Sequence, residues 1–345
     1  MADLPLVSRD RFRGFQCLCA RADRLDYVVA DGREEGESMV RRAVVLVALM
    51  VAVVACDDGV EQQPTSAVPG ADKLNRLRST DICALLPESE LAKLGPVAAV
   101  GTDWLYECEA AIGDDLSDPD ASVEWVVRAV ENTEMDQATN ITIDGMSVTL
   151  LGDHDVLSEE ELADRTFRMC SAYAQLPTGG SIDLTVELPP GTEPCPVAQS
   201  LVTVALSEWK RFPKLGDSPH TVRTVVTGAD PCDVLTELPD ARVGDNQWVD
   251  RCWFQLDGDS LYVEYGHSTD REFTNYKSLE IDGRRVYRTS DEPNGTYKVR
   301  VGPTFDPVAD GYEFESVPAV SIAGAERETI EKVTAAVLTL FPDAD

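Results

Sequence analysis

The pattern of apolar and polar positions predicts mostly short β-strands after residue 80. Runs rich in β-branched and aromatic residues, bounded by turn-forming residues, are typical of strands. They fall at residues 104–112, 123–130, 166–176 and 182–188, and again at 248–256, 261–265, 297–301 and 312–317. Asp144-Gly145 and Asp282-Gly283 each separate two apolar alternations. Asp-Gly supplies the positive φ of a type I′ turn, so both positions predict β-hairpins.

Helical periodicity is confined to a few segments. Residues 195–209 and 326–341 show it most clearly, and Ile330, Val333 and Val337 lie on one apolar face of the second segment. Asp81 and Asp230 can each cap a short opening helix. The order helix, strands, helix predicts an α+β fold, with an antiparallel sheet flanked by an N-terminal and a C-terminal helix.

The same order of landmarks occurs twice, which predicts a tandem duplication. Asp-x-Cys at 81–83 recurs at 230–232, and Trp-x-x-x-Cys at 104–108 recurs at 248–252. The Asp-Gly turn and the closing helix follow in both halves. We therefore expect two similar domains, at 79–212 and 222–345, joined by a segment rich in proline and glycine.

The duplication also predicts the disulfides. Excluding Cys17, Cys19 and Cys56, six cysteines remain, and an even number in an exported chain favours disulfide bonds. The second domain has two cysteines, so Cys232 is expected to pair with Cys252 if that domain folds alone. By equivalence Cys83 pairs with Cys108, which leaves Cys170 to pair with Cys195.

The N-terminal region predicts export and a lipid anchor. Arg41-Arg42 precedes an uncharged, mostly apolar run at 43–55, which is too short to span a bilayer but fits a signal peptide. We predict a lipoprotein signal at 39–55, with lipid attached to Cys56 and the chain held on the outer face of the cell membrane. Residues 1–38 are interpreted as an over-called or disordered extension, with translation starting at Met39. Residues 56–78 are predicted to be a disordered tether.

The charge of the chain limits the classes of partner. The net charge is −32, with 30 Lys and Arg against 62 Asp and Glu. Binding to nucleic acid depends on basic residues that neutralise phosphates, so no nucleic-acid function is expected. Acidity of this kind favours solubility outside the cell, with binding of divalent cations or a basic partner as the alternative.

These motifs resemble those of a family of actinobacterial cell-envelope lipoproteins built on a domain of unknown function. The first half matches at Asp81, Cys83, Leu86, Trp104, Cys108, Cys170 and Cys195. The second half matches at Asp230, Cys232, Leu235, Trp248 and Cys252 and lacks the second cysteine pair. The resemblance implies an exported, membrane-anchored, non-enzymatic protein that binds a ligand or partner.

Residues that could carry chemistry are few. Trp104 and Trp248 are expected to cover the disulfides rather than to bind a ligand. Asp153-His154-Asp155 is interpreted as a polar turn rather than a metal site, because zinc needs three or four convergent ligands. An acidic loop at 114–120 lacks the order of ligands found in an EF-hand. No metal or other cofactor is predicted.

No enzyme motif is convincing, so no catalytic residues are assigned. The chain lacks G-x-S-x-G, H-E-x-x-H and a phosphate-binding loop. Ser207 and Lys210 have the Ser-x-x-Lys spacing without its companion motifs, which we attribute to chance. The expected function is a binding module in the cell envelope that contacts an envelope protein or wall component. The alternative is a carrier or sensor that holds a small apolar or lipidic ligand between sheet and helix.

Overall fold

The computed structural model describes residues 70–102, 104–116, 119–129, 135, 137–245, 247–290, 295–307 and 315–342. The predicted signal segment, Cys56 and residues 57–69 of the predicted tether lie outside these ranges. Within the described ranges, no helix is long and apolar enough to cross a membrane.

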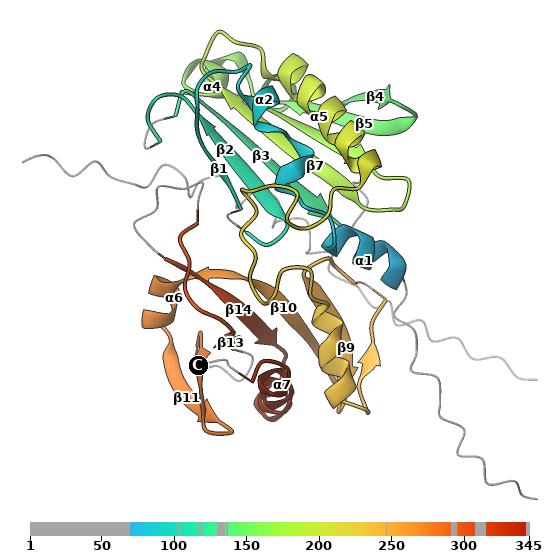
Figure 1. The fold of residues 1–345 in the computed structure, drawn as a ribbon, viewed down its shortest axis with the longest axis vertical. Coiled ribbons are helices and arrows are strands. Elements are labelled where there is room, and N and C mark those ends of the chain that lie inside the picture. Colours follow the sequence, from blue (N-terminus) through green and yellow to red (C-terminus); the bar gives the residue numbers. More distant parts are fainter. Residues whose placement is uncertain are drawn as a thin grey trace, which may run out of the picture. The chain divides into compact units, whose positions relative to one another are not determined.

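The first half of the chain forms a seven-stranded antiparallel sheet (Figure 1). Its strand order is β1-β2-β3-β7-β6-β5-β4. The strands are β1 (Val97–Gly101), β2 (Glu107–Ile112), β3 (Ala121–Arg128), β4 (Thr139–Ile143), β5 (Met146–Gly152), β6 (Arg168–Gln175) and β7 (Ser181–Leu188). The helical elements are α1 (Ala71–Arg78), the 3₁₀ helix η3 (Cys83–Leu85), α2 (Glu88–Leu91), α3 (Asp153–Val156), α4 (Glu159–Ala163) and α5 (Pro194–Arg211).

The second half forms another seven-stranded antiparallel sheet, in the order β11-β12-β13-β14-β10-β9-β8. Its strands are β8 (Arg242–Val243), β9 (Arg251–Leu256), β10 (Asp259–Thr269), β11 (Lys277–Ile281), β12 (Arg284–Arg288), β13 (Tyr297–Arg300) and β14 (Ser316–Ala323). The helical elements are the 3₁₀ helix η4 (Pro231–Glu237), α6 (Asp270–Thr274) and α7 (Arg327–Leu340).

The two sheets have the same topology. When the second order is read from β8, each strand takes the place of its counterpart in chain order: β8 for β1, β9 for β2, β10 for β3, and β14 for β7. The Asp-Gly hairpins join β4 to β5 and β11 to β12, with φ of 51° at both Asp144 and Asp282 and positive φ at the following glycines. Seven strands in one order, with matching turns, support the duplication.

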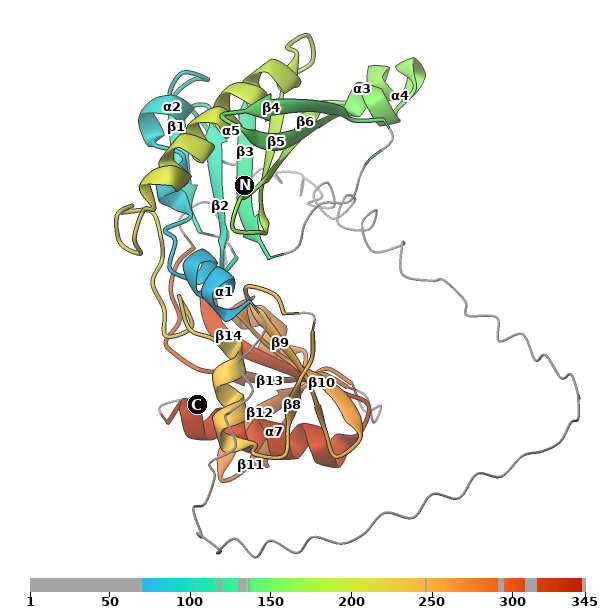
Figure 2. The ribbon, with the colours of Figure 1, turned by 90° about the vertical axis from the view of Figure 1, so that its right-hand side faces the viewer.

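One long helix packs on each sheet through its apolar residues. In α5, buried residues including Leu201, Val202 and Leu206 face β5, β6 and β7. In α7, Ile330 and Val333 are fully buried, and the helix lies along β13 and β14 (Figure 2). Burying one such side chain contributes about 1.5–3 kcal/mol, so these faces hold helix and sheet together.

The predicted short opening helices are present in both halves, and both are 3₁₀ helices. Asp230 caps η4 as predicted, because its carboxylate accepts from the Cys232 N–H at 2.8 Å, whereas the N-cap position of η3 is Ile82 rather than the predicted Asp81. Leu86 and Leu238 end them with extended φ, and each precedes a proline. Proline disfavours helical geometry in the residue that precedes it, which explains why these helices end after so few residues.

The predicted tether is also partly wrong, because its last eight residues form α1. Leu74 and Leu77 are almost completely buried, at 2% and 1% exposure. Arg78 at the helix end is equally buried. Burial of one apolar face stabilises a helix too short to persist alone in water.

Three disulfides are present, in the pairs that the duplication predicts. They join Cys83 to Cys108, Cys170 to Cys195, and Cys232 to Cys252. The first and third connect the 3₁₀ helix to the second strand of each sheet. The remaining bridge connects β6 to the start of α5.

The prediction that Trp104 and Trp248 cover disulfides is wrong. They are 43% and 39% exposed, since both lie in the turn before the strand rather than in the strand itself. In the first sheet the cover is Trp125, which is fully buried and lies opposite Cys108 in the β2–β3 register. Its indole N–H donates to the Ile82 carbonyl at 2.7 Å, which satisfies its only polar group.

Candidate interaction surface

Each sheet has a second face that its long helix does not cover. Along β9 and β10, Cys252 and Val263 point to the α7 side and are fully buried. The alternate residues Arg251, Trp253 and Tyr262 point the other way and are only half-buried. We call this second side the open face of the second sheet.

Arg251 lies at the centre of an aromatic cluster on this face. Its guanidinium carbon is 4.6 Å from the ring centroids of both Trp248 and Tyr262, and 5.8 Å from that of Trp253. The Trp253 and Tyr262 rings are 4.8 Å apart. Glu264 forms an ion pair with Arg251. A cation over an aromatic face contributes about 0.5–2 kcal/mol, so these contacts fix the position of the guanidinium. These five residues are called the Arg251 cluster.

The loop before β9 is held by partly buried hydrogen bonds, which place Trp248 beside Arg251. The Gln247 amide nitrogen donates to the carbonyls of Gly244 and Trp253 at 2.7 and 2.8 Å. Its carbonyl oxygen accepts from the Trp253 N–H at 3.0 Å. The Trp248 N–H in turn donates to the Arg251 carbonyl at 3.0 Å.

Arg78 of α1 supports the same loop. Its side chain is 1% exposed and forms a 2.7 Å ion pair with Asp230. Its Nε–H donates to the Val249 carbonyl at 2.8 Å. A buried arginine needs such partners because desolvating a charge is costly. The backbone around Trp248 is therefore tied to a residue 170 positions earlier in the chain.

Burial also affects the carboxylates of this region. It raises the pKa of Glu264, although the positive charge of Arg251 opposes the shift. Burial likewise raises the pKa of Asp250, against the opposing charges of Arg251, Arg128 and Arg78. Desolvation disfavours the charged form of a carboxylate, so both groups bind a proton more readily than free acids do.

The far half of the open face repeats the combination of cation, carboxylate and ring. The Lys298 ammonium is 2.9 Å from Glu272 and the Arg300 guanidinium is 2.6 Å from Asp270, both carboxylates belonging to α6. Arg300 also lies 4.5 Å from the centroid of the Phe273 ring. Arg251, Lys298 and Arg300 on this face thus each lie next to an acid and an aromatic ring.

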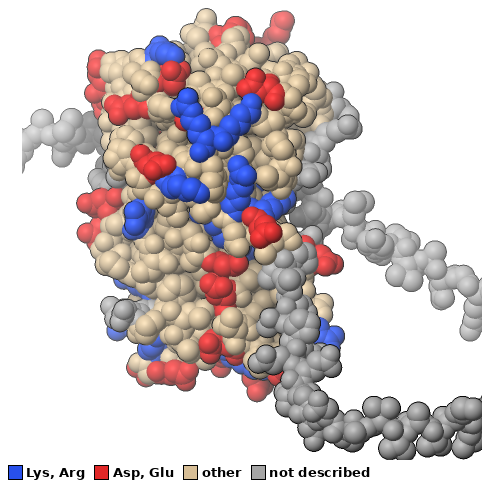
Figure 3. All heavy atoms as spheres, turned by 45° about the vertical axis from the view of Figure 1, so that its right-hand side comes forward, with Lys and Arg blue, Asp and Glu red and all other residues tan. Residues whose placement is uncertain are grey.

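The corresponding face of the first sheet has a different composition. Cys108 and Cys252 occupy the same place in the two sheets, so Glu107 matches Arg251 and Glu109 matches Trp253. By the same register Glu124 matches Tyr262. Three glutamates thus occupy the positions of one arginine and two aromatic residues. On the face of the molecule seen in Figure 3, basic side chains lie among acidic ones.

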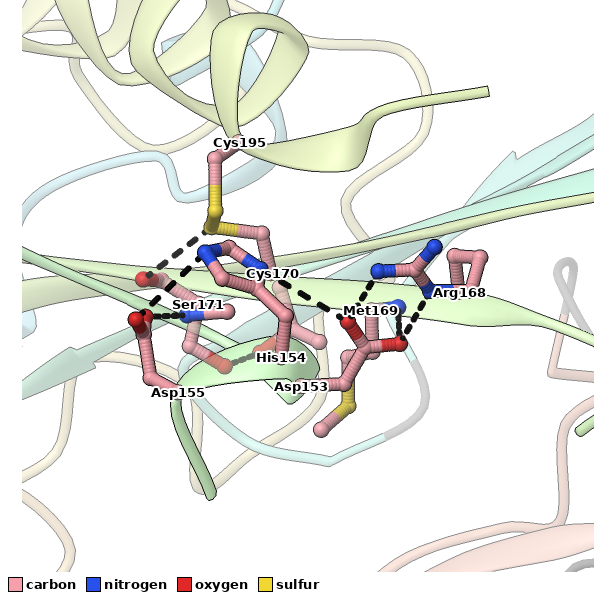
Figure 4. The surroundings of a disulfide bond; sticks show 10 residues. Asp153, His154, Asp155, Arg168, Met169, Cys170, Ser171 and Cys195 are labelled. Carbon is pink, nitrogen blue, oxygen red and sulfur yellow. Dashed lines mark hydrogen bonds and ion pairs between the residues drawn. A yellow bond between two sulfur atoms is a disulfide. The ribbon is translucent and has the colours of Figure 1, made fainter. Parts of the chain in front are cut away.

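The structure gives Asp153, His154 and Asp155 structural partners, and they form the short helix α3 rather than the predicted turn (Figure 4). Both Asp153 oxygens accept from Arg168, at 2.8 and 2.9 Å. Burial alone would raise the pKa of Asp153, but the hydrogen bonds from Arg168 and the Met169 N–H lower it. Asp155 accepts from the Gly152 N–H at 2.8 Å. Among the described residues, no group of three or more His, Cys, Asp or Glu side chains is arranged to hold a metal ion.

The other candidate residues are not brought together with catalytic partners in the described ranges. Ser207 is exposed on α5, and Lys210 forms a 2.8 Å ion pair with Asp144. In the acidic loop Asp114 is exposed, while Asp118 lies outside the described residues.

The larger of the two best-formed cavities, of about 470 Å³, does not lie between a sheet and its long helix. It is lined by Leu215, Val222, Arg223, Thr224, Val225, Thr227, Pro303, Thr304, Phe305 and Pro318. These residues belong to the connecting segment and to the region around β14. The second cavity, of about 10 Å³, is at the lower limit for holding one water molecule.

Comparison with known proteins identifies no family. No family model matches the chain, and no curated protein matches it. Among solved structures, the chain is similar to DynU16, from the dynemicin biosynthetic locus, at 11% identity. That match covers 78% of this chain and 92% of DynU16 with a TM-score of 0.14, too low to support any argument.

The Arg251 cluster was missed in the sequence because its members come from a loop and two strands. The available signal was the alternation along residues 251–256, in which Arg251, Trp253 and Gln255 alternate with Cys252, Phe254 and Leu256. Alternation of this kind identifies two faces of a strand, and aromatic residues on the polar face indicate an interaction surface.

Proposed function

We propose that this chain is a lipid-anchored, extracytoplasmic binding protein that recognises a protein partner through the open face of its second sheet. The observation that carries the proposal is the Arg251 cluster, in which an arginine and three aromatic rings remain partly exposed on a fixed framework. Trp, Tyr and Arg are the residues that contribute most binding energy at protein interfaces. The proposed anchor is Cys56, because it closes the signal-like segment at 39–55.

The fixed position of these side chains favours binding. Gln247 and Arg78 hold the loop that carries Trp248, while Trp253 and Tyr262 lie on neighbouring strands. Side chains that are already ordered lose little conformational entropy when a partner binds, and that loss is a main cost of association. A preorganised surface of this kind therefore loses less conformational entropy on binding than an exposed flexible loop does.

The alternative of a small ligand held between sheet and helix has less support. Val202 and Leu206 of α5, and Ile330 and Val337 of α7, are completely buried. The larger cavity lies in the connecting region instead. Both helix-to-sheet layers are occupied by side chains, which favours recognition at a surface.

Native mass spectrometry tests the proposal on protein extracted in mild detergent from its own cells. We expect a mass that begins at lipidated Cys56, with three disulfides and one additional polypeptide. Trp248→Ala should remove that polypeptide, whereas the matched variant Trp104→Ala in the first sheet should retain it. Retention in both variants would contradict the assigned surface, and a stoichiometric small ligand would favour the carrier function. An unlipidated mass beginning near Met1 would contradict the proposed location.

A further inference from the structure

The three disulfides differ in how deeply their cysteine residues are buried. Two bridges have both ends buried, namely Cys83–Cys108 and Cys232–Cys252, with no cysteine more than 6% exposed. In the third bridge Cys170 is completely buried, but Cys195 is half-buried at the start of α5. Exchange of a disulfide requires access to one sulfur, and Cys195 is the most exposed of the six bridged cysteines.

The position of Cys195 stabilises a thiolate. It is the second residue of an 18-residue helix, after Pro194, and no acidic residue occurs in the first turn. Glu193 at the N-cap position has a side chain that is 68% exposed and lies 3.9 Å from Arg168. The unpaired N–H groups and the dipole at a helix N-terminus favour negative charge on a nearby sulfur. The nearby Asp153 carboxylate is paired with Arg168, which reduces its repulsion of that charge.

The imidazole of His154 lies against the same sulfur (Figure 4). A Cβ atom placed on Gly152 would be 2.5 Å from the His154 Nδ1 and 3.0 Å from the Cys195 Sγ. Ring and sulfur therefore share the space beside this glycine. The His154 side chain is 47% exposed, so the group beside the sulfur lies at the surface of the protein.

The fold itself does not require this bridge. The second sheet has the same strand order and a closing helix, yet its half of the chain has no cysteines besides Cys232 and Cys252. The bridge shared by both halves is the buried one. The extra bridge in the first half is thus an addition to a fold that forms without it.

We propose that Cys170–Cys195 is a site of thiol–disulfide exchange with small-molecule thiols, while the other two bridges are inert. An external thiolate attacks the Cys195 sulfur and forms a mixed disulfide. The Cys170–Cys195 bond breaks, and its electron pair leaves on the Cys170 sulfur, which takes a proton from water. A second external thiolate then attacks the external sulfur of the mixed disulfide and releases Cys195 as a thiolate. In total, two external thiols are oxidised to their disulfide and one protein disulfide is reduced to two thiols.

Reduced glutathione tests the proposal on the folded full chain without denaturant. Samples are quenched with an alkylating reagent, and peptide mass spectrometry follows each cysteine separately. We expect Cys170 and Cys195 to become modified at least about tenfold faster than the other four bridged cysteines, with glutathione found first on Cys195. Equal rates for all three bridges, glutathione first on Cys170, or no reduction without denaturant would each overturn the proposal.

Two single variants identify the reactive sulfur independently. With glutathione disulfide as the probe, Cys170→Ser should form a mixed disulfide rapidly at the remaining Cys195. Cys195→Ser should leave the buried Cys170 unmodified for at least about ten times longer. The opposite order would contradict the assignment, and circular dichroism checks that each variant is folded. If a variant does not fold, the measurement on the unaltered chain still decides the question.

Discussion

The two sheets share a topology and differ on the face that their long helices leave open. At matching positions of the strand pairing that both halves share, the first sheet has Glu107, Glu109 and Glu124, and the second has Arg251, Trp253 and Tyr262. The helix-facing positions are apolar and buried in both. The duplicated fold thus keeps an apolar core in both halves, while the open faces of the two sheets differ in charge and aromatic content. This difference supports the proposed recognition through the second face.

The largest expected effect concerns the support of the second face. Arg78→Ala removes a buried ion pair with Asp230 and the hydrogen bond to the Val249 carbonyl. Breaking a buried pair costs about 3–5 kcal/mol, because one charge loses its partner. We expect a loss of that size in the free energy of unfolding, measured by urea denaturation.

The control for Arg78 is Asp72→Asn, at an exposed position of the same helix. It should change the free energy of unfolding by less than about 0.5 kcal/mol, as is usual for surface substitutions. A loss below about 1 kcal/mol in Arg78→Ala would show that α1 does not support the loop that carries Trp248.

The next prediction concerns the cover over the buried disulfides. Trp125 lies opposite Cys108, and Val263 lies opposite Cys252 at the matching position. Trp125→Val leaves a cavity and an unpaired Ile82 carbonyl, so we expect a loss of about 3 kcal/mol on urea denaturation. Trp104→Val, at the exposed tryptophan, should cost less than about 1 kcal/mol. The reverse order of the two losses would show that Trp104 covers the bridge after all.

The smallest effect is a dependence of stability on pH. Burial raises the pKa values of Asp250 and Glu264 above those of the unfolded chain. At pH values between the pKa of each carboxylate in the unfolded chain and its higher pKa in the folded protein, the folded state binds more protons than the unfolded state. The free energy of unfolding therefore increases as the pH falls through this range and decreases as the pH rises. We expect the melting temperature to rise slightly as the pH is lowered from about 7 towards the pKa values of free carboxylates. The lowered pKa of Asp153 has the opposite sign, so its contribution is lost on stronger acidification.

Asp250→Asn tests the pH dependence directly. The matching residue of the first sheet is Tyr106, so this carboxylate is specific to the second half. The variant should melt higher than the unaltered chain at pH 7, and the difference should shrink below about pH 4, where free aspartate is protonated. A variant that melts lower at pH 7 would show that the buried charge is favourable where it lies.

Local patterns in the sequence predicted the parts of the fold that local physics determines. The Asp-Gly hairpins and the closing helices depend on turn chemistry and on 3.6-residue periodicity, and both are present. Strand β1 was missed because Val97–Gly101 consists of valine, alanine and glycine and becomes a strand only through pairing with β2. Helix α1 was missed because burial against distant residues stabilises it.

The candidate site depended even more on contacts between distant residues. Which tryptophan covers a disulfide is decided by the register between β2 and β3, where Trp125 lies opposite Cys108. The residue spacing within either strand does not determine which residues of the two strands lie opposite each other. The Arg251 cluster likewise needs β9 paired with β10 and a loop held by Arg78. The sequence contained the residues, but only the fold showed which of them share a surface.

The most direct test of the central claim is crosslinking in living cells from the two exposed tryptophans. A photoreactive phenylalanine, p-benzoylphenylalanine, replaces Trp248 in one strain and Trp104 in another, since both positions tolerate a large aromatic side chain at the surface. We predict one discrete crosslinked protein from position 248 and none from position 104, with the product lost when Arg251→Ala is added. The same products from both positions, or crosslinks to wall glycan alone, would contradict recognition of a protein through the open face of the second sheet.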